Sequence, residues 1–220
     1  MEMMGGVLLE FLAALFDMDG TLIDSMGVWA RVDEAFFARR NMALPADYAR
    51  SISGLSFRQT AEYTKSRFSL PDSVDEIMDE WNQTCESAYR YEVPLKPGAK
   101  DYLFHLKNKG VKLAVATALP ERLYRPVLVR TGVYSLFDAF ASTDETGKSK
   151  RDGEIYRLAA KRLGIPCECC AVFEDILDGL LGAREAGMKA YCVRDDSAKK
   201  DEARAREICD CYVESFTDLL

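Results

Sequence analysis

Short apolar runs and segments with helical spacing alternate along the second half of the chain. The runs cover 111–117, 137–142, 170–174 and 188–193, and the helical segments lie near 120–131, 153–163 and 178–186. A further apolar run at 11–16 has the composition of a strand that is buried on both faces. Strands that alternate with helices in this way form a parallel sheet. The pattern therefore predicts an α/β fold.

Between Asp24 and Tyr91 the pattern changes to helical spacing alone. Apolar positions recur there at steps of three and four residues behind an Asp72-Ser73 capping signal, at Val74, Ile77, Met78, Trp81, Cys85, Ala88 and Tyr89. This spacing is typical of amphipathic helices that pack against one another. We predict a helical bundle at 24–94, inserted into an α/β core that is formed by 1–23 and 95–220.

Length and charge limit the classes of function. The 220 residues allow one sizeable core with a smaller insert, and the net charge of −7 is unsuited to a nucleic-acid surface, which needs clustered positive charge. No segment reaches the length of a membrane span, and the apolar run at 7–16 contains Glu10 and follows no basic residue, unlike a secretory signal. We expect a cytoplasmic protein that acts on soluble small molecules, without nucleic acid or membrane as a partner. The sequence leaves the oligomeric state open.

Seven cysteines are an odd number in a chain of this size, which favours reduced thiols over a disulfide framework. Cys167 and Cys170 have a C-x-x-C spacing, and Cys209 and Cys211 follow later, so a zinc site is an alternative. The first pair leads directly into the predicted strand at 170–174, where Cys packs as a small apolar residue. We favour core packing over zinc.

Two carboxylates follow the first predicted strand directly. Asp17 and Asp19 are two residues apart, so in an extended segment they face the same way and can converge on one metal ion or one reacting group. Gly20 then allows a tight turn. Ligands of parallel sheets bind at the carboxyl ends of the strands, which favours an active site here. From these residues alone, an ordinary strand with an Asp-Gly turn is an equally good interpretation.

Other chemical groups follow the later strands. Thr117 ends the run at 111–117, a polar loop with Lys148 and Lys150 comes after the next run, and Glu174-Asp175 ends the run at 170–174. Four such placements at strand ends are far less expected by chance than any one of them. From its position alone, either Lys148 or Lys150 could be the functional lysine.

This order of motifs resembles the haloacid dehalogenase-like superfamily of hydrolases, in particular its branch of phosphatases and β-phosphoglucomutases. The resemblance covers nearly the whole chain and rests on Asp17-Met18-Asp19-Gly20-Thr21, Thr117, Lys150 and Glu174-Asp175. It implies a Rossmann-like, doubly wound parallel sheet with an inserted α-helical cap that closes over the active site. The hinges of the cap would lie near 24–27 and 92–97.

The resemblance also implies the roles of the site residues. Asp17 would be the nucleophile that forms an aspartyl phosphate, and Asp19 the general acid and base. Thr117 and Lys150 would bind the phosphoryl group. Lys150 is preferred over Lys148 because its spacing to Tyr156 matches the spacing from lysine to aromatic residue in the family, and Lys148 is expected to be solvated. The ligands of a Mg²⁺ cofactor would come from Asp17, Asp19, Asp175 and Glu174. The residues alone do not distinguish the role of Asp17 from that of Asp19.

Electrostatics explains why these residue types belong together. At about 4 Å and an effective dielectric constant near 20, two unit charges of like sign cost about 4 kcal/mol, so a dianionic phosphate that approaches Asp17 is opposed by roughly twice that. A divalent cation and the Lys150 ammonium would offset this repulsion. Magnesium suits such a site because it prefers oxygen ligands.

The helical insert offers one segment for substrate recognition, Ser53-Gly54-Leu55-Ser56-Phe57-Arg58. Relatives with a similar glycine-containing loop carry an Arg that meets the substrate, but Arg58 is displaced by one position. An ordinary solvated helix residue accounts for Arg58 equally well. We include Gly54, Arg58 and Ala118 among the substrate-binding positions, although relatives frequently carry a polar residue at position 118.

Three functions fit these observations. The leading one is a magnesium-dependent phosphatase that acts on a small phosphorylated metabolite. A β-phosphoglucomutase-like phosphoryl transferase needs the same motifs, and a non-catalytic protein of the same fold is a third alternative. The aromatic residues Trp29, Phe36 and Phe37 have helical spacing, so we expect them in the core of the cap and not in a sugar-stacking surface.

Overall fold

Six parallel strands form the central sheet. The computed structural model describes residues 11–52 and 54–220. The strands are β1 (Ala13–Phe16), β2 (Lys112–Thr117), β3 (Ala139–Ser142), β4 (Cys170–Glu174), β5 (Lys189–Val193) and β6 (Cys211–Val213). Their order is β3-β2-β1-β4-β5-β6, and every neighbouring pair is parallel. The strand order reverses between β1 and β4, which is where open α/β sheets bind ligands.

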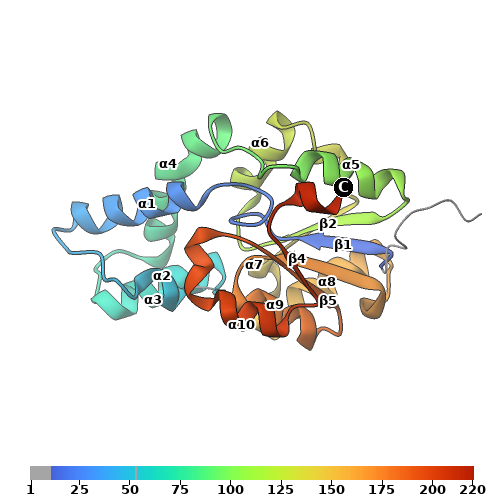
Figure 1. Cartoon of the computed structure of the whole chain (residues 1–220). Helices are drawn as coiled ribbons and strands as arrows, with labels where there is room; N and C mark the ends of the chain where they lie inside the picture. Colours follow the sequence, from blue (N-terminus) through green and yellow to red (C-terminus); the bar gives the residue numbers. More distant parts are fainter. Residues whose placement is uncertain (1–10, 53) are drawn as a thin grey trace, which may run out of the picture.

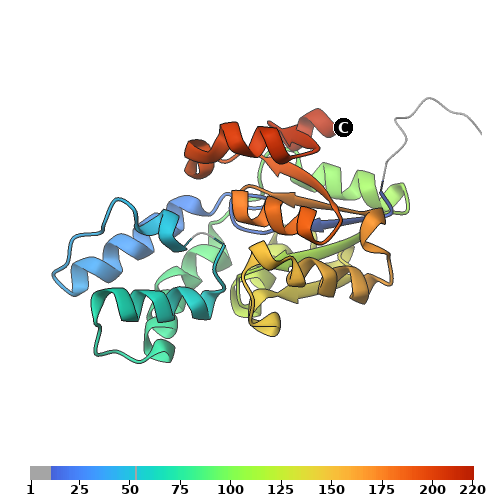
Figure 2. The ribbon, with the colours of Figure 1, turned by 90° about the horizontal axis from the view of Figure 1, so that it is seen from below.

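Helices cover both faces of this sheet (Figures 1 and 2). One face packs against α5 (Ala99–Asn108) and α6 (Glu121–Arg130), and the other against α8 (Glu154–Leu163), α9 (Leu177–Glu185) and α10 (Glu202–Ile208). Along β1 the buried side chains alternate between the two layers: Ala14 and Phe16 face the first, and Ala13 and Leu15 the second. The predicted Rossmann-like, doubly wound fold is confirmed.

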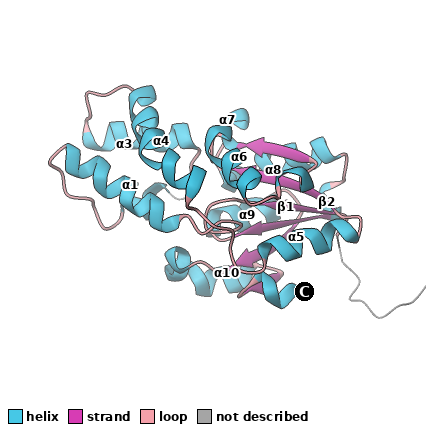
Figure 3. Ribbon diagram, turned by 90° about the horizontal axis from the view of Figure 1, so that it is seen from above, coloured by secondary structure: helices cyan, strands magenta, loops and turns pink. Residues whose placement is uncertain are grey.

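A unit of four helices lies at the carboxyl ends of the strands (Figures 1 and 3). It consists of α1 (Met26–Arg39), α2 (Tyr48–Ile52), α3 (Phe57–Phe68) and α4 (Val74–Tyr91). Capping boxes start two of them, with Ser56 and Gln59 at α3 and Ser73 and Glu76 at α4. The predicted helical cap is confirmed, and Phe36 and Phe37 are buried in its core.

The two segments that join the cap to the sheet run side by side. Asp24 N donates to Pro94 O at 3.0 Å, and Lys96 N donates to Leu22 O at 2.9 Å. The predicted domain boundaries, after residue 23 and before residue 95, fall within these paired segments. Hinge motion at this place stays a prediction.

The sequence pattern did not identify β6, which contains only three residues and follows the short helix α10. Too few alternating positions are present in such a strand to produce a recognisable pattern. All seven cysteines are free thiols, and Cys85, Cys170 and Cys192 are buried. Within residues 11–52 and 54–220, no helix combines the length and apolar character that a membrane span needs.

A half-buried carboxyl group in the cap makes the stability of the protein sensitive to pH. Burial raises the pKa of Asp33 on α1 from 3.8 to about 7. Between about pH 4 and pH 7 the Asp33 carboxyl is protonated in the folded protein but ionised in the unfolded chain. The folded state therefore loses stability as the pH rises from about 4 to about 7. We expect Asp33→Asn to raise the free energy of unfolding by about 1–2 kcal/mol at pH 8 and by less at pH 5.

Urea titrations of the two proteins at both pH values measure this difference. Glu34→Gln, at the adjacent exposed position on α1, is the matched control. An equal gain at pH 5 and pH 8 would contradict the assignment to Asp33 ionisation.

Candidate active site

The register of the sheet brings the candidate carboxylates together at the switch point. Asp17 N donates to Phe173 O at 3.0 Å, which continues the pairing of β1 with β4 beyond Phe16. Asp17 therefore lies beside Glu174, the last residue of β4, with Asp175 next to it. Thr117 ends β2 on the other side of β1, and its Oγ1 accepts a hydrogen bond of 3.0 Å from Leu119 N.

Lys150 is the cation of this cluster. Only 4% of its side chain is exposed, and its Nζ lies 2.5 Å from Asp17 Oδ1 and 2.5 Å from Glu174 Oε1. Burial alone would lower the pKa of Lys150, but the carboxylates of Asp17 and Glu174 outweigh it and raise the pKa above its ordinary value. Lys150 is therefore charged at neutral pH. Lys148 is exposed, as expected for a solvated residue.

Asp17, Glu174 and Asp175 form a buried acidic trio suited to a metal ion. Each offers one carboxylate oxygen, and these oxygens lie within 4.8 Å of one another. In the part of the chain that the structure describes, no other group of His, Cys, Asp or Glu side chains could hold a metal ion in this way. Burial, followed by the nearby carboxylates of Glu174 and Asp17, raises the pKa of Asp175 well above its ordinary value. Burial also raises the pKa of Glu174 to about 7, although Lys150 opposes this shift. A cation is the group that would stabilise the ionised form of this trio.

The hydrogen bonding of Asp175 supports the same conclusion. Thr21 Oγ1 donates to Asp175 Oδ1 at 2.9 Å, whereas the buried Oδ2 has no hydrogen-bond partner. The turn at Gly20 approaches this carboxylate so closely that a Cβ there would lie 2.4 Å from Oδ2. Burial of a carboxylate oxygen without a hydrogen-bond partner costs free energy unless a ligand binds to that oxygen. The donor set therefore fits Mg²⁺.

Asp19 lies apart from the trio and faces the cap. Its Oδ1 accepts hydrogen bonds of 2.5 Å from Ser25 Oγ and 2.5 Å from Tyr89 OH, and its Oδ2 accepts one of 3.1 Å from Trp29 Nε1. Asp19 does not belong to the acidic trio, and these donors engage both of its oxygens, while its role as a metal ligand stays a prediction. Burial raises the pKa of Asp19 to about 6, although the hydrogen bonds from Ser25 and Tyr89 oppose this shift. A carboxyl group with this pKa suits proton transfer near neutral pH.

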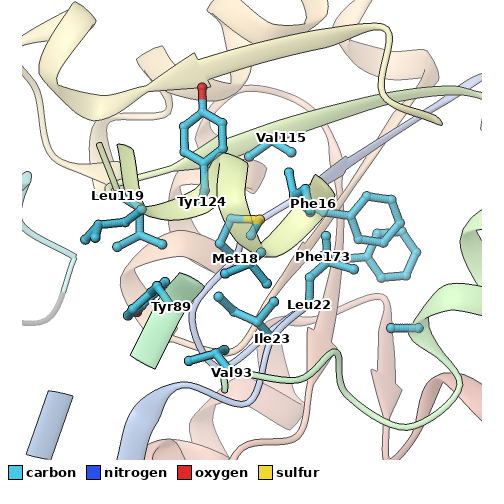
Figure 4. Close-up of a cluster of buried hydrophobic side chains, with 14 of the residues drawn as sticks. Phe16, Met18, Leu22, Ile23, Tyr89, Val93, Val115, Leu119, Tyr124 and Phe173 are labelled. Carbon is cyan, nitrogen blue, oxygen red and sulfur yellow. The ribbon is translucent and has the colours of Figure 1, made fainter. Parts of the chain in front are cut away.

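The sequence analysis missed the cap residues that hold Asp19. Trp29 contacts Asp19 in addition to the rings of Phe57 and Tyr89, so it is more than the core residue that we predicted. Tyr89 lies in the apolar stripe of α4, and Figure 4 shows it in the buried cluster that also contains Leu119. One signal was present in the sequence: Ser25, the N-cap of α1, and Trp29 are four residues apart, which places their side chains on the same side.

The three predicted substrate-binding residues lie in different surroundings. Gly54 O accepts a hydrogen bond of 3.0 Å from Lys150 N, so this part of the cap contacts the cluster directly. Arg58 is half exposed and pairs with Asp75 at 2.8 Å, which directs its guanidinium towards α4. Ala118 is partly buried just after β2. Ser53, which we predicted in the same loop as Gly54, lies outside the described residues.

Residues 11–187 match the sequence model of the haloacid dehalogenase-like hydrolases. Hexitol phosphatase B of Escherichia coli is 28% identical over 232 residues, which cover 96% of this chain and 95% of that protein. A phosphorylated carbohydrates phosphatase of Thermotoga maritima is 28% identical over 177 residues, 80% of this chain and 82% of that one. Among solved structures, a β-phosphoglucomutase from Clostridium difficile shares the fold with a TM-score of 0.80 and 20% identity, over 96% of this chain and 93% of that one.

These matches agree with the geometry of the site and favour an enzyme over the alternative of a non-catalytic protein. The chain belongs to the haloacid dehalogenase-like hydrolases, and it is a phosphoric monoester hydrolase.

Proposed function

We propose that the protein is a magnesium-dependent phosphatase that hydrolyses small phosphorylated sugars or sugar alcohols through phospho-Asp17. The observation that carries this proposal is the arrangement of Asp17, which lies 2.5 Å from the Lys150 ammonium and beside an acidic trio whose Asp175 Oδ2 has no partner. Asp17 is thus a carboxylate nucleophile held next to the groups that would neutralise a phosphoryl group.

The residues suggest a reaction in two steps. In the first, an oxygen of Asp17 attacks phosphorus, the ester P–O bond breaks, and Asp19 gives its proton to the departing alkoxide. In the second, Asp19 takes a proton from water, the water oxygen attacks phosphorus, and Asp17 is released with inorganic phosphate. Asp19 can serve both steps because its pKa of about 6 permits both protonation states near neutral pH.

The surrounding groups would orient and neutralise the phosphoryl oxygens. Lys150 places a buried positive charge beside Asp17, and Thr117 ends the adjacent strand, where its hydroxyl can donate a hydrogen bond. Asp17, Asp175 and the nearby Glu174 would hold Mg²⁺, which would supply further positive charge at the phosphoryl site. Water must be excluded while Asp17 attacks, and the cap that contacts Asp19 suits this task.

The relatives support a class of substrate. Hexitol phosphatase B and the phosphorylated carbohydrates phosphatase act, by their names, on polyol and carbohydrate phosphates. We extend this class to the present chain and place substrate recognition at Gly54, Arg58 and Ala118. A role for Arg58 stays a prediction that its pairing with Asp75 does not favour. A cytoplasmic location also stays a prediction.

A panel of sugar, polyol and nucleotide phosphates, assayed for release of inorganic phosphate, tests this function. We expect release from sugar or polyol phosphates with Mg²⁺, and little release with Ca²⁺, whose larger and more variable coordination shell misplaces nucleophile and phosphate. Full activity in excess chelator would contradict the metal requirement. Isomerisation of a sugar phosphate without net phosphate release would replace the proposal with the phosphoglucomutase-like alternative.

A further inference from the structure

We propose that Gly54 and Asp178 form a docking contact through which the closed cap positions Lys150. This inference rests on the proposed function, because it assigns a consequence to the placement of the phosphate-binding lysine. It concerns positioning residues, since neither Gly54 nor Asp178 needs to touch the reacting atoms.

The cap supplies the hydrogen-bond acceptor for the Lys150 amide. Lys150 is the first residue of the 3-10 turn η2 (Lys150–Asp152), so its N–H has no acceptor within that turn. Its partner is Gly54 O at 3.0 Å, from the segment between α2 and α3 of the cap. Opening of the cap would therefore release this N–H to water.

The other groups of Lys150 are held by the core. A Cβ at Gly182 of α9 would lie 1.9 Å from Lys150 O, which shows how closely α9 packs against this backbone. The side chain ends between Asp17 and Glu174. The amide contact with Gly54 is thus the connection by which the cap acts on a residue that the core otherwise fixes.

Asp178 shapes the surface on which Gly54 rests. Gly54 has a φ of +77°, and a Cβ there would lie 2.8 Å from Asp178 Cβ and 3.1 Å from Asp178 Oδ2. The Asp178 carboxylate is itself fixed by Arg151, at 2.9 Å from Nη1 to Oδ1. Only glycine allows this approach, because any side chain would push the cap away from α9. Asp178 therefore acts at the contact with the cap.

The matched comparison uses two glycines with the same backbone conformation. Gly110 also has a φ of +77°, but a Cβ there would meet nothing within 4 Å. Gly110→Ala thus carries the same backbone strain as Gly54→Ala without the steric conflict. The double variant Gly54→Ala/Asp178→Gly keeps the strain and removes the conflicting side chain.

Hydrogen exchange at the Lys150 amide, followed by NMR on ¹⁵N-lysine-labelled protein without substrate, reads the contact directly. We expect Gly54→Ala to speed this exchange by roughly tenfold, corresponding to about 1.4 kcal/mol, and to lower kcat more than it raises KM. We expect Gly110→Ala to change neither the exchange rate at Lys150 nor kcat. The double variant should recover a large part of the lost amide protection and of the lost kcat. Thermal unfolding of each variant shows that it is folded.

Two results would overturn the proposal: exchange at Lys150 that is unchanged in Gly54→Ala, or a double variant no better than the single one. Its failure is distinguishable from failure of the proposed function. A protein that protects the Lys150 amide but hydrolyses no phosphate ester refutes the function, whereas an active phosphatase with an unprotected amide refutes the docking contact.

Discussion

Asp17→Asn is expected to abolish turnover and to leave the protein folded. The substitution keeps the shape of the side chain but removes the carboxylate that attacks phosphorus. Lys150 retains Glu174 as a counter-charge at 2.5 Å, so the buried ammonium is not left without a partner. We expect kcat to fall by about 10⁴-fold or more, because the amide that replaces the carboxylate cannot attack phosphorus in its place.

Initial rates on the best substrate of the panel, together with thermal unfolding curves, measure this outcome. Asp101→Asn is the matched control, since Asp101 is an exposed acid on α5, outside the site and the predicted hinges. Its activity should stay close to that of the unmodified protein. More than trace turnover by a clean Asp17→Asn preparation would remove Asp17 from the role of nucleophile.

Lys150→Met should lower both activity and stability, whereas Lys148→Met should change little. Methionine keeps an apolar stem of similar length but removes the charge that neutralises Asp17 and Glu174. Breaking one partner of a buried ion pair costs about 3–5 kcal/mol, and loss of a group that stabilises the transition state lowers kcat by about 10²–10³-fold. Lys148 is exposed, so its replacement should alter the free energy of unfolding by about 0.5 kcal/mol or less.

Urea titrations measure the loss of stability, and thermal unfolding curves identify the temperature at which the Lys150→Met protein is folded. Rates measured at that temperature then separate the loss of catalysis from the loss of structure. The reverse ranking of the two lysines would transfer the phosphate-binding role to Lys148.

The convergence of the core residues could be predicted because it depends on strand position alone. Carboxyl ends of parallel strands share one edge of the sheet, so Asp17 and Glu174-Asp175 had to lie near one another once their strands were recognised as neighbours. Lys150 was harder, since its loop has no periodicity, and the spacing of a known family supported the choice over Lys148. The structure brings Lys150 to Asp17, while the catalytic roles of both stay predictions.

The contacts between cap and core could not be predicted in the same way. An apolar stripe reports that Tyr89 faces inwards, but it does not show that the phenol reaches Asp19 across the boundary of two units. The same holds for Trp29, whose ring satisfies the helical pattern while its Nε1 meets a carboxylate. The position of Asp178 against Gly54 depends on how the cap docks, which no local pattern encodes.

The central claim is that turnover passes through phospho-Asp17, and trapping that intermediate tests it most directly. An acyl phosphate is reduced by borohydride, which would convert a phosphorylated Asp17 into homoserine. The protein would be mixed with substrate and Mg²⁺, quenched in acid during turnover, reduced and mapped by peptide mass spectrometry. We predict homoserine at position 17 only when substrate is present. Homoserine at position 19 instead, or continued turnover with unmodified Asp17 in every quenched sample, would contradict the mechanism.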